Sequence, residues 1–156
     1  MTTSTYGQQM ETICNADATL AAILTGGVHL FDDLGGQGLN RIQVAQAFKN
    51  KTTGRLNPVC VIYEADDIPT GEAVDMPTGF TSLLVPIVGW IYDDPAVGYT
   101  TIDAAQKRMY TLLHGARLSG GFQLLWKNTI KRKREPLLQD AGYYQFIVNA
   151  HGFRTF

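Results

Sequence analysis

Apolar residues recur at helical spacing in two stretches of the chain. In residues 10–25 they share one helical face, and Gly26-Gly27 ends the pattern. In residues 100–115 a threonine cap begins the pattern, Asp103 lies in its first turn and Gly115 follows its end. The two apolar stripes are Ile13, Leu20, Ile23 and Leu24, and Ile102, Ala105, Met109 and Leu112. We therefore predict one helix over residues 10–25 and a second over 100–115.

Runs rich in β-branched and aromatic residues predict the strands, which lie at 28–31, 59–63, 80–94, 122–134 and 143–156. In the last strand we expect Tyr144, Phe146 and Val148 on one face. Pro86 and Gly89 interrupt the strand over 80–94, and because proline has no N–H for a ladder we expect an edge position or a bulge there. Residues 41–50 are compatible with a short helix or an extended segment.

The order of these elements is helix, strands, helix, strands. It favours an α+β fold, a mostly antiparallel β-sheet packed against two helices, over a doubly wound βαβ fold. The 156 residues, of which 45% are hydrophobic and 17% charged, fit a single domain over residues 1–156 and exclude intrinsic disorder. No apolar run approaches the ~20 residues of a membrane span, and the first residues lack the features of a signal peptide. We expect a protein that is made and kept in a cytoplasm, with no membrane partner.

Candidate catalytic and metal-binding residues are few. His29, His114 and His151 lie in different elements without a metal-ligand spacing, and we interpret His114 as a favourable charge at a helix C-terminus. Cys14 and Cys60 lie in apolar patterns, so we expect buried thiols. No serine lies in a nucleophile-elbow motif, and the glycines of residues 26–38 match no phosphate-binding motif. We expect no catalytic residue, metal or cofactor.

Charge is segregated along the chain although the net charge is only −1. Residues 56–106 contain no Lys or Arg and eight acids, which are Glu64, Asp66, Asp67, Glu72, Asp75, Asp93, Asp94 and Asp103. Residues 107–134 contain no acid and eight basic residues. Such a two-signed monomer is suited to a head-to-tail contact between copies, which generates a ring when the rotation closes.

The acid pairs have two interpretations. Asp32-Asp33, Asp66-Asp67 and Asp93-Asp94 each follow an apolar run at a turn, where capping and solvation of a strand end explain them. In an enzyme such carboxylates would instead hold Mg²⁺. The basic run Lys131–Arg134 likewise fits a solvated strand edge, and a DNA-binding site is its alternative.

Four segments give the chain a resemblance to a known family. They are ILTGGVHLFDDLGGQG at the end of the first helix, PVCVIYEADD, TIDAAQKRMYTLLHG and EPLLQDAGYYQFIVNAHGF. Their order and pattern resemble the small tail-completion or tail-terminator proteins of long-tailed bacteriophages, over most of the chain. Residues 37–58 depart from the family pattern.

The resemblance implies a structural virion protein that assembles in the host cytoplasm. Such a protein forms a hexameric ring at the head-proximal end of the tail tube, stops tube growth and joins the tail to a head connector or stopper protein, without a cofactor. We expect the acidic loop, Glu64, Asp66, Asp67, Glu72 and Asp75, to line a channel through which DNA passes without specific binding. We expect the basic residues Lys107, Arg108, Lys131, Arg132, Lys133 and Arg134 to contact a neighbouring subunit or ring.

Three alternatives stay open at this stage. The first is another neck component, a connector or a stopper, which is also small, ring-forming and channel-lined. A small cytoplasmic enzyme whose acid pairs hold Mg²⁺ would show a Mg²⁺-dependent thermal shift. A DNA-binding protein acting through Lys131–Arg134 would bind DNA with a steep salt dependence.

Overall fold

The strands of the chain form one sheet. The computed structural model describes residues 5–30, 41–47, 50–64, 68–69, 80–93, 100–135 and 141–155. The strand order is β1-β2-β4-β6-β5, with β3 paired to β4 beside this path. The bounds are β1 (Gly27–Leu30), β2 (Val59–Glu64), β3 (Ile68–Pro69), β4 (Phe80–Asp93), β5 (Gln123–Glu135) and β6 (Ala141–Thr155). The pair β1–β2 is parallel and the other pairs are antiparallel.

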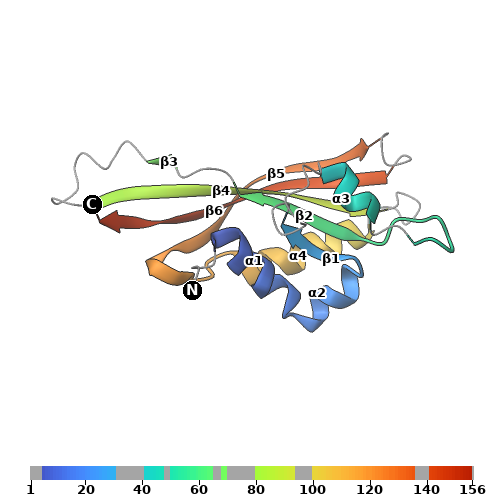
Figure 1. Ribbon diagram of the computed structural model, residues 1–156, viewed down its shortest axis with the longest axis horizontal. Coiled ribbons are helices and arrows are strands. Elements are labelled where there is room, and N and C mark those ends of the chain that lie inside the picture. The colour runs from blue at the N-terminus through green and yellow to red at the C-terminus, as the bar shows by residue number, and fades with distance from the viewer. Residues whose placement is uncertain are drawn as a thin grey trace.

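The helices lie on both faces of this sheet. They are α1 (Tyr6–Asn15), α2 (Ala18–Ile23), α3 (Arg41–Ala47) and α4 (Thr100–Leu113). Figure 1 shows α1, α2 and α4 together against one face and α3 on the other, while β4 and β6 extend beyond the helices. A short 3₁₀ turn (Ser119–Gly121) leads into β5. The predicted α+β class is confirmed, and the segment 41–50, for which two interpretations stood open, contains a helix.

The prediction of a single helix over residues 10–25 is wrong in one respect, because the chain forms two helices there, α1 and α2. Thr5 and Gln8 make a capping box that starts α1. The Asp17 side chain then accepts a hydrogen bond from the Leu20 N–H at 2.8 Å and starts α2. A good capping residue inside an apolar periodic stretch thus begins a new helix instead of continuing the old one.

The main core lies between the sheet and α1, α2 and α4. The predicted faces are buried there, since Ile102, Ala105 and Met109 are fully buried on α4 and Phe146 and Val148 on β6. On α4 the helix face is rotated slightly from the prediction, because Leu113 is fully buried and Leu112 only partly. A smaller core on the other face packs α3 against the sheet and contains Ala45, Val59, Val61 and Tyr92.

Pro86 lies in an internal strand, where we predicted an edge or a bulge. Along β4, the pairing with β2 ends at Ile87, opposite Glu64, and the pairing with β3 begins at Leu84, opposite Ile68. Pro86 falls between these two pairings, so on that side it faces no strand of the part of the chain that the structure describes. The strand is therefore internal as a whole and edge-like at its proline.

Both outer edges of the sheet are protected against pairing with another chain. At the β1 edge, the Asn15 side chain donates to the Val28 carbonyl (3.0 Å) and accepts from the Val28 N–H (3.2 Å). Glu11 of the same helix accepts from the Leu30 N–H at 2.6 Å. At the other edge, β5 is irregular, with register shifts at Trp126/Asn128 and Ile130/Lys133. Satisfied backbone groups and bulges are both known means of blocking strand addition.

Candidate functional site

The predicted acidic loop begins at Glu64, the last residue of β2. Its carboxylate accepts a hydrogen bond from the Gly7 N–H in the first turn of α1 at 2.5 Å. A carboxylate at this position also interacts favourably with the helix dipole. A Cβ at Gly7 would come within 2.8 Å of Glu64 Oε2 and 3.0 Å of Leu30 Cδ1, so a side chain there would make these groups shift. Asp66, Asp67, Glu72 and Asp75 lie outside the described residues, so Glu64 is the one member of the set whose contacts are known.

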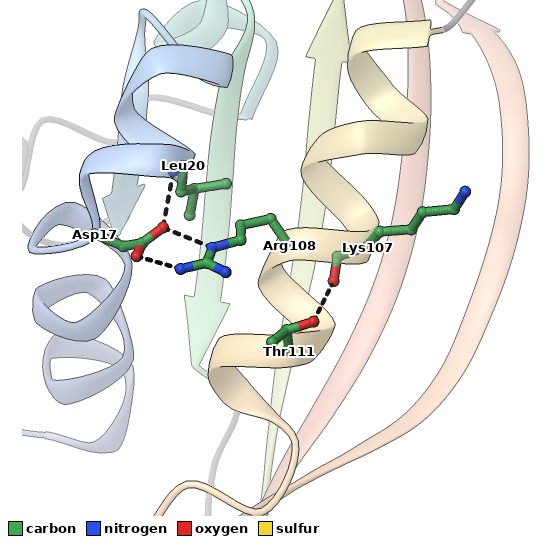
Figure 2. Close-up of polar contacts among 5 residues, drawn as sticks. All are labelled: Asp17, Leu20, Lys107, Arg108 and Thr111. Carbon is green, nitrogen blue, oxygen red and sulfur yellow. Dashed lines mark hydrogen bonds and ion pairs between the residues drawn. The ribbon is translucent and has the colours of Figure 1, made fainter.

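The two basic residues predicted on α4 have different surroundings. Arg108 forms a two-point ion pair with Asp17, with Nε 2.9 Å from Oδ2 and a terminal nitrogen 2.7 Å from Oδ1. Figure 2 shows Arg108 directed toward α2, and Lys107 extending from the opposite side of α4. Arg108 therefore joins α4 to the cap of α2, whereas Lys107 is exposed.

This ion pair fixes the charge state of Asp17. The Arg108 hydrogen bonds, and secondly the hydrogen bond from the Leu20 backbone, lower the pKa of Asp17 from 3.8 to about 2. The same carboxylate thus caps α2 and holds α4. Arg108, which we predicted as an interface residue, has a structural contact within its own subunit.

The basic run Lys131–Arg134 lies in the distal half of β5, an edge strand of the sheet. The structure describes the backbone of these four residues and not their side chains. Lys133 pairs with Tyr143 and Arg134 with Gly142, while Lys131 and Arg132 fall in the register shift between them and Ile130. A regular strand would present alternate residues on one face, and the shift breaks that alternation. The start of β5, in contrast, is held beside the end of α4 by the hydrogen bonds Gly115 N–H to Leu124 O and Leu124 N–H to Ala116 O.

An aromatic cluster that the sequence analysis missed lies at this junction of α4 and β5. The rings of Tyr110 and His114 stack at 4.9 Å, and Tyr110 meets Trp126 edge-on at 5.9 Å. Trp126 in turn stacks on the buried Phe146 at 4.7 Å. His114 Nδ1 accepts a hydrogen bond from the Trp126 backbone N–H, so the ring that we interpreted as a helix-end charge ties the helix to the strand.

A second contact that the sequence did not predict joins Ser82 and His151, whose Oγ and Nε2 atoms lie 2.8 Å apart. The residues are 69 positions apart and come together only because β4 pairs with β6. A serine beside a histidine is the nucleophile–base pair of many hydrolases, which also supply a group that orients the histidine and donors for the oxyanion. Here the neighbour of the His151 ring is Phe153, at 5.9 Å, and the hydrogen bond links two strands.

The two cysteines are buried, as predicted. Burial raises the pKa of the Cys14 thiol to about 12, with smaller contributions from Asp17 and Glu11, and raises the pKa of Cys60 as well. Both thiols are therefore protonated and unsuited to nucleophilic chemistry. A shallow cavity of about 200 Å³ beside Cys14, between α2 and β1, is smaller than the roughly 300–1,000 Å³ of most ligand sites.

One acid departs from the expected placement. Asp93 ends β4 with 3% of its surface exposed, so the prediction of a solvated strand end is wrong for this residue.

Within the described ranges no group of three or more His, Cys, Asp and Glu side chains is placed to hold a metal ion. Nor is any helix among those residues long and apolar enough to cross a membrane.

Comparison with known proteins supports the fold. No protein-family model matches the chain, and no curated protein matches it by sequence. Among solved structures, the chain is similar to a chain of the virion of a native gene transfer agent particle. The two share 18% sequence identity and superpose with a TM-score of 0.57, over 91% of this chain and 90% of the other. At this level of identity the similarity establishes a common fold.

Proposed function

We propose that this chain is a structural virion protein that forms a ring, hexameric by family resemblance, at the head-proximal end of a tail tube. The ring ends tube growth and joins the tail to the head, and it assembles in the host cytoplasm. The observation that carries the proposal is the fold, which spans about nine tenths of both this chain and a chain of a gene transfer agent virion. In such a role the protein acts through contacts with other proteins and not through catalysis.

The contacts between subunits would use the faces of the sheet and not its two outer edges. The β1 edge is occupied by Asn15 and Glu11, and the β5 edge is broken by two register shifts. Strand addition at either edge would have to displace these features. Segregated charge supports a head-to-tail contact, in which one surface of a subunit meets a different surface of the next and the series closes into a ring.

The acidic segment after β2 fits a DNA channel. Glu64 is engaged with α1, so it anchors the segment, and Asp66, Asp67, Glu72 and Asp75 supply charge beyond it. A lumen lined with carboxylates repels phosphates and allows DNA to slide without specific binding. The proposed partners are therefore further copies of the chain, the tail tube protein and a head connector or stopper, with no cofactor.

A tube-growth assay tests this function. Tail tube protein is polymerised with and without the purified chain, and tube lengths are measured by electron microscopy. We expect shorter tubes with a narrow length distribution when the chain is present, and an unchanged distribution with an unrelated protein of the same size. Tubes that grow equally long in both samples would contradict a terminator role.

The alternative within the same class is a connector or stopper elsewhere in the neck. Such a protein would bind isolated head portals and leave tube growth unchanged, so the same preparation, mixed with portals, separates the two. The acid pairs Asp32-Asp33 and Asp66-Asp67 of the Mg²⁺-enzyme alternative, and Asp94, lie outside the described residues. Among the residues that the structure describes, no group of three or more possible ligands is placed to hold a metal.

A further inference from the structure

Lys107, Tyr110, His114, Arg117, Trp126 and Lys127 form what we call the aromatic–basic surface. Lys107 and Tyr110 of α4 and His114, which directly follows the helix, are spaced i, i+3 and i+7, and the His114 N–H still bonds to the Tyr110 carbonyl, so the three lie along one stripe. All three are exposed, Tyr110 to 44%. Trp126, on the adjoining strand β5, packs edge-on against Tyr110. The exposed Lys127 follows Trp126 in β5, and the exposed Arg117 precedes the strand and bridges to its first residue, Gln123. The surface therefore combines two exposed aromatic rings of this stripe with three exposed cations.

The aromatic rings of this surface are held in place by contacts within the subunit. The His114 ring is held by stacking on Tyr110 and by the Trp126 N–H, and Trp126 is fixed from below by the buried Phe146. Aromatic side chains that are already ordered lose little entropy when a partner binds, and they are enriched at the centres of interfaces. Tyrosine is among the residues most enriched at interfaces because its ring supplies apolar contact area and its hydroxyl a hydrogen bond.

The charge of the surface selects an acidic partner. No Asp or Glu occurs anywhere in residues 107–134, so nothing in this stretch neutralises Lys107, Arg117 and Lys127. The chain itself carries the complementary segment, Glu64–Asp75, with five acids and no base. Glu64 ends β2, and both β4 and β6 lie between β2 and β5 in the sheet. The two regions thus start from different parts of the subunit, as a head-to-tail contact requires.

We propose that the aromatic–basic surface binds the acidic segment Glu64–Asp75 of a second copy of this chain, through the acids that follow Glu64, which stays bound to Gly7 of its own subunit. The acids that this contact engages then hold the ring together and do not line the channel. The proposal rests on the proposed ring, and it assigns the ring contact to Lys107, Tyr110, His114 and Trp126 in place of Arg108, which is engaged with Asp17. A protein segment is favoured over DNA because the chain has a net charge of −1 and the surface has only three cations among its described residues.

A peptide titration tests the contact without requiring a ring. A capped peptide EADDIPTGEAVD, residues 64–75, is added to the ¹⁵N-labelled full chain, and the two indole N–H signals are followed by NMR. We expect the Trp126 signal to shift and the Trp90 signal to stay, because Trp90 packs against the α3 core on the other face. Binding should weaken with salt and become about tenfold weaker in Lys107→Glu.

Control variants and ligands separate this contact from non-specific charge effects and from DNA binding. Lys51→Glu, at an exposed turn, should bind the peptide as the unaltered chain does, and a peptide with Asn and Gln in place of the acids should not bind. An unmoved Trp126 signal, or equal binding by Lys107→Glu, would overturn the proposal. So would single-stranded or duplex DNA that binds the same residues more tightly than the peptide, which would make the surface a nucleic-acid site.

A charge-swap experiment then connects the contact to assembly. The variant Lys107→Glu/Lys127→Glu and the variant Glu72→Lys/Asp75→Lys should each fail to cap tubes, since like charges then meet at every contact. An equimolar mixture should cap them, because each surface then meets a segment of opposite charge. If both variants cap tubes alone, the ring stands and this contact is wrong. If the peptide binds as expected and the unaltered chain caps no tubes, the contact stands and the proposed function is wrong.

Discussion

At the residue scale, Gly89 is a core position with no room for a side chain. A Cβ at Gly89 would lie 2.1 Å from the ring of Phe146, its partner across β4 and β6 and itself fully buried. Gly89→Ala should therefore lower the free energy of unfolding by about 1–3 kcal/mol, as overpacked cores do. Urea denaturation measures this change.

Phe146→Leu provides the matched test, because a shorter side chain leaves room for the new methyl group. The double variant Gly89→Ala/Phe146→Leu should lose less stability than the sum of the two single variants, since the residues share one space. Additive losses would show that the methyl group is accommodated elsewhere.

Asp17 is the residue whose charge the fold uses most directly. Its pKa is lowered from 3.8 to about 2 by Arg108 and by the Leu20 N–H, so the unfolded chain binds a proton more readily than the folded one. The stabilisation is present above about pH 4 and is lost as pH falls from 4 toward 2. Asp17→Asn keeps a capping side chain and removes the charge. We expect the unaltered protein to be more stable than Asp17→Asn above pH 4, and this difference in the free energy of unfolding to narrow as pH falls from 4 toward 2.

Thermal unfolding of both proteins from pH 7 to pH 2.5 measures that difference. Using the difference removes the contribution of the other carboxyl groups, which both proteins share. A gap in melting temperature that stays constant down to pH 2.5 would mean that the ion pair with Arg108 does not form in solution.

At the element scale, the β1 edge depends on α1. Asn15→Ala removes both side-chain bonds to Val28 and leaves its N–H and carbonyl without these partners in a partly buried site. We expect a loss of about 2 kcal/mol in the free energy of unfolding and a greater tendency to aggregate through the freed edge. Thr12→Ala, on the exposed side of the same helix, should change stability by less than about 0.5 kcal/mol. Equal losses in both variants would show that the two bonds to Val28 make no contribution of their own.

Elements with a complete local pattern were predictable from the sequence. The helix over 100–115 has a cap, an apolar stripe and a terminal glycine, and the structure has α4 at Thr100–Leu113. The break between α1 and α2 was not predicted, because a capping aspartate within a periodic apolar stretch is locally compatible with a continuous helix. The same aspartate also pairs with Arg108, 91 residues away, a contact that no local pattern indicates.

At the scale of the whole molecule, the fold class followed from the order of elements and the arrangement of strands did not. Nothing local indicates that β1 joins β2 in parallel or that β4 is internal. The aromatic–basic surface was missed for the same reason, since Tyr110 and Trp126 meet only once β5 lies beside α4. Charge segregation, in contrast, is a property of the sequence itself and led to the ring proposal before any contact was known.

The most direct test of the central claim is negative-stain electron microscopy of the purified chain, alone and mixed with tail tubes of its own virus. The account predicts rings with an open centre, or density that caps one end of each tube and leaves the other end bare. A monodisperse monomer that leaves both tube ends unchanged would contradict it.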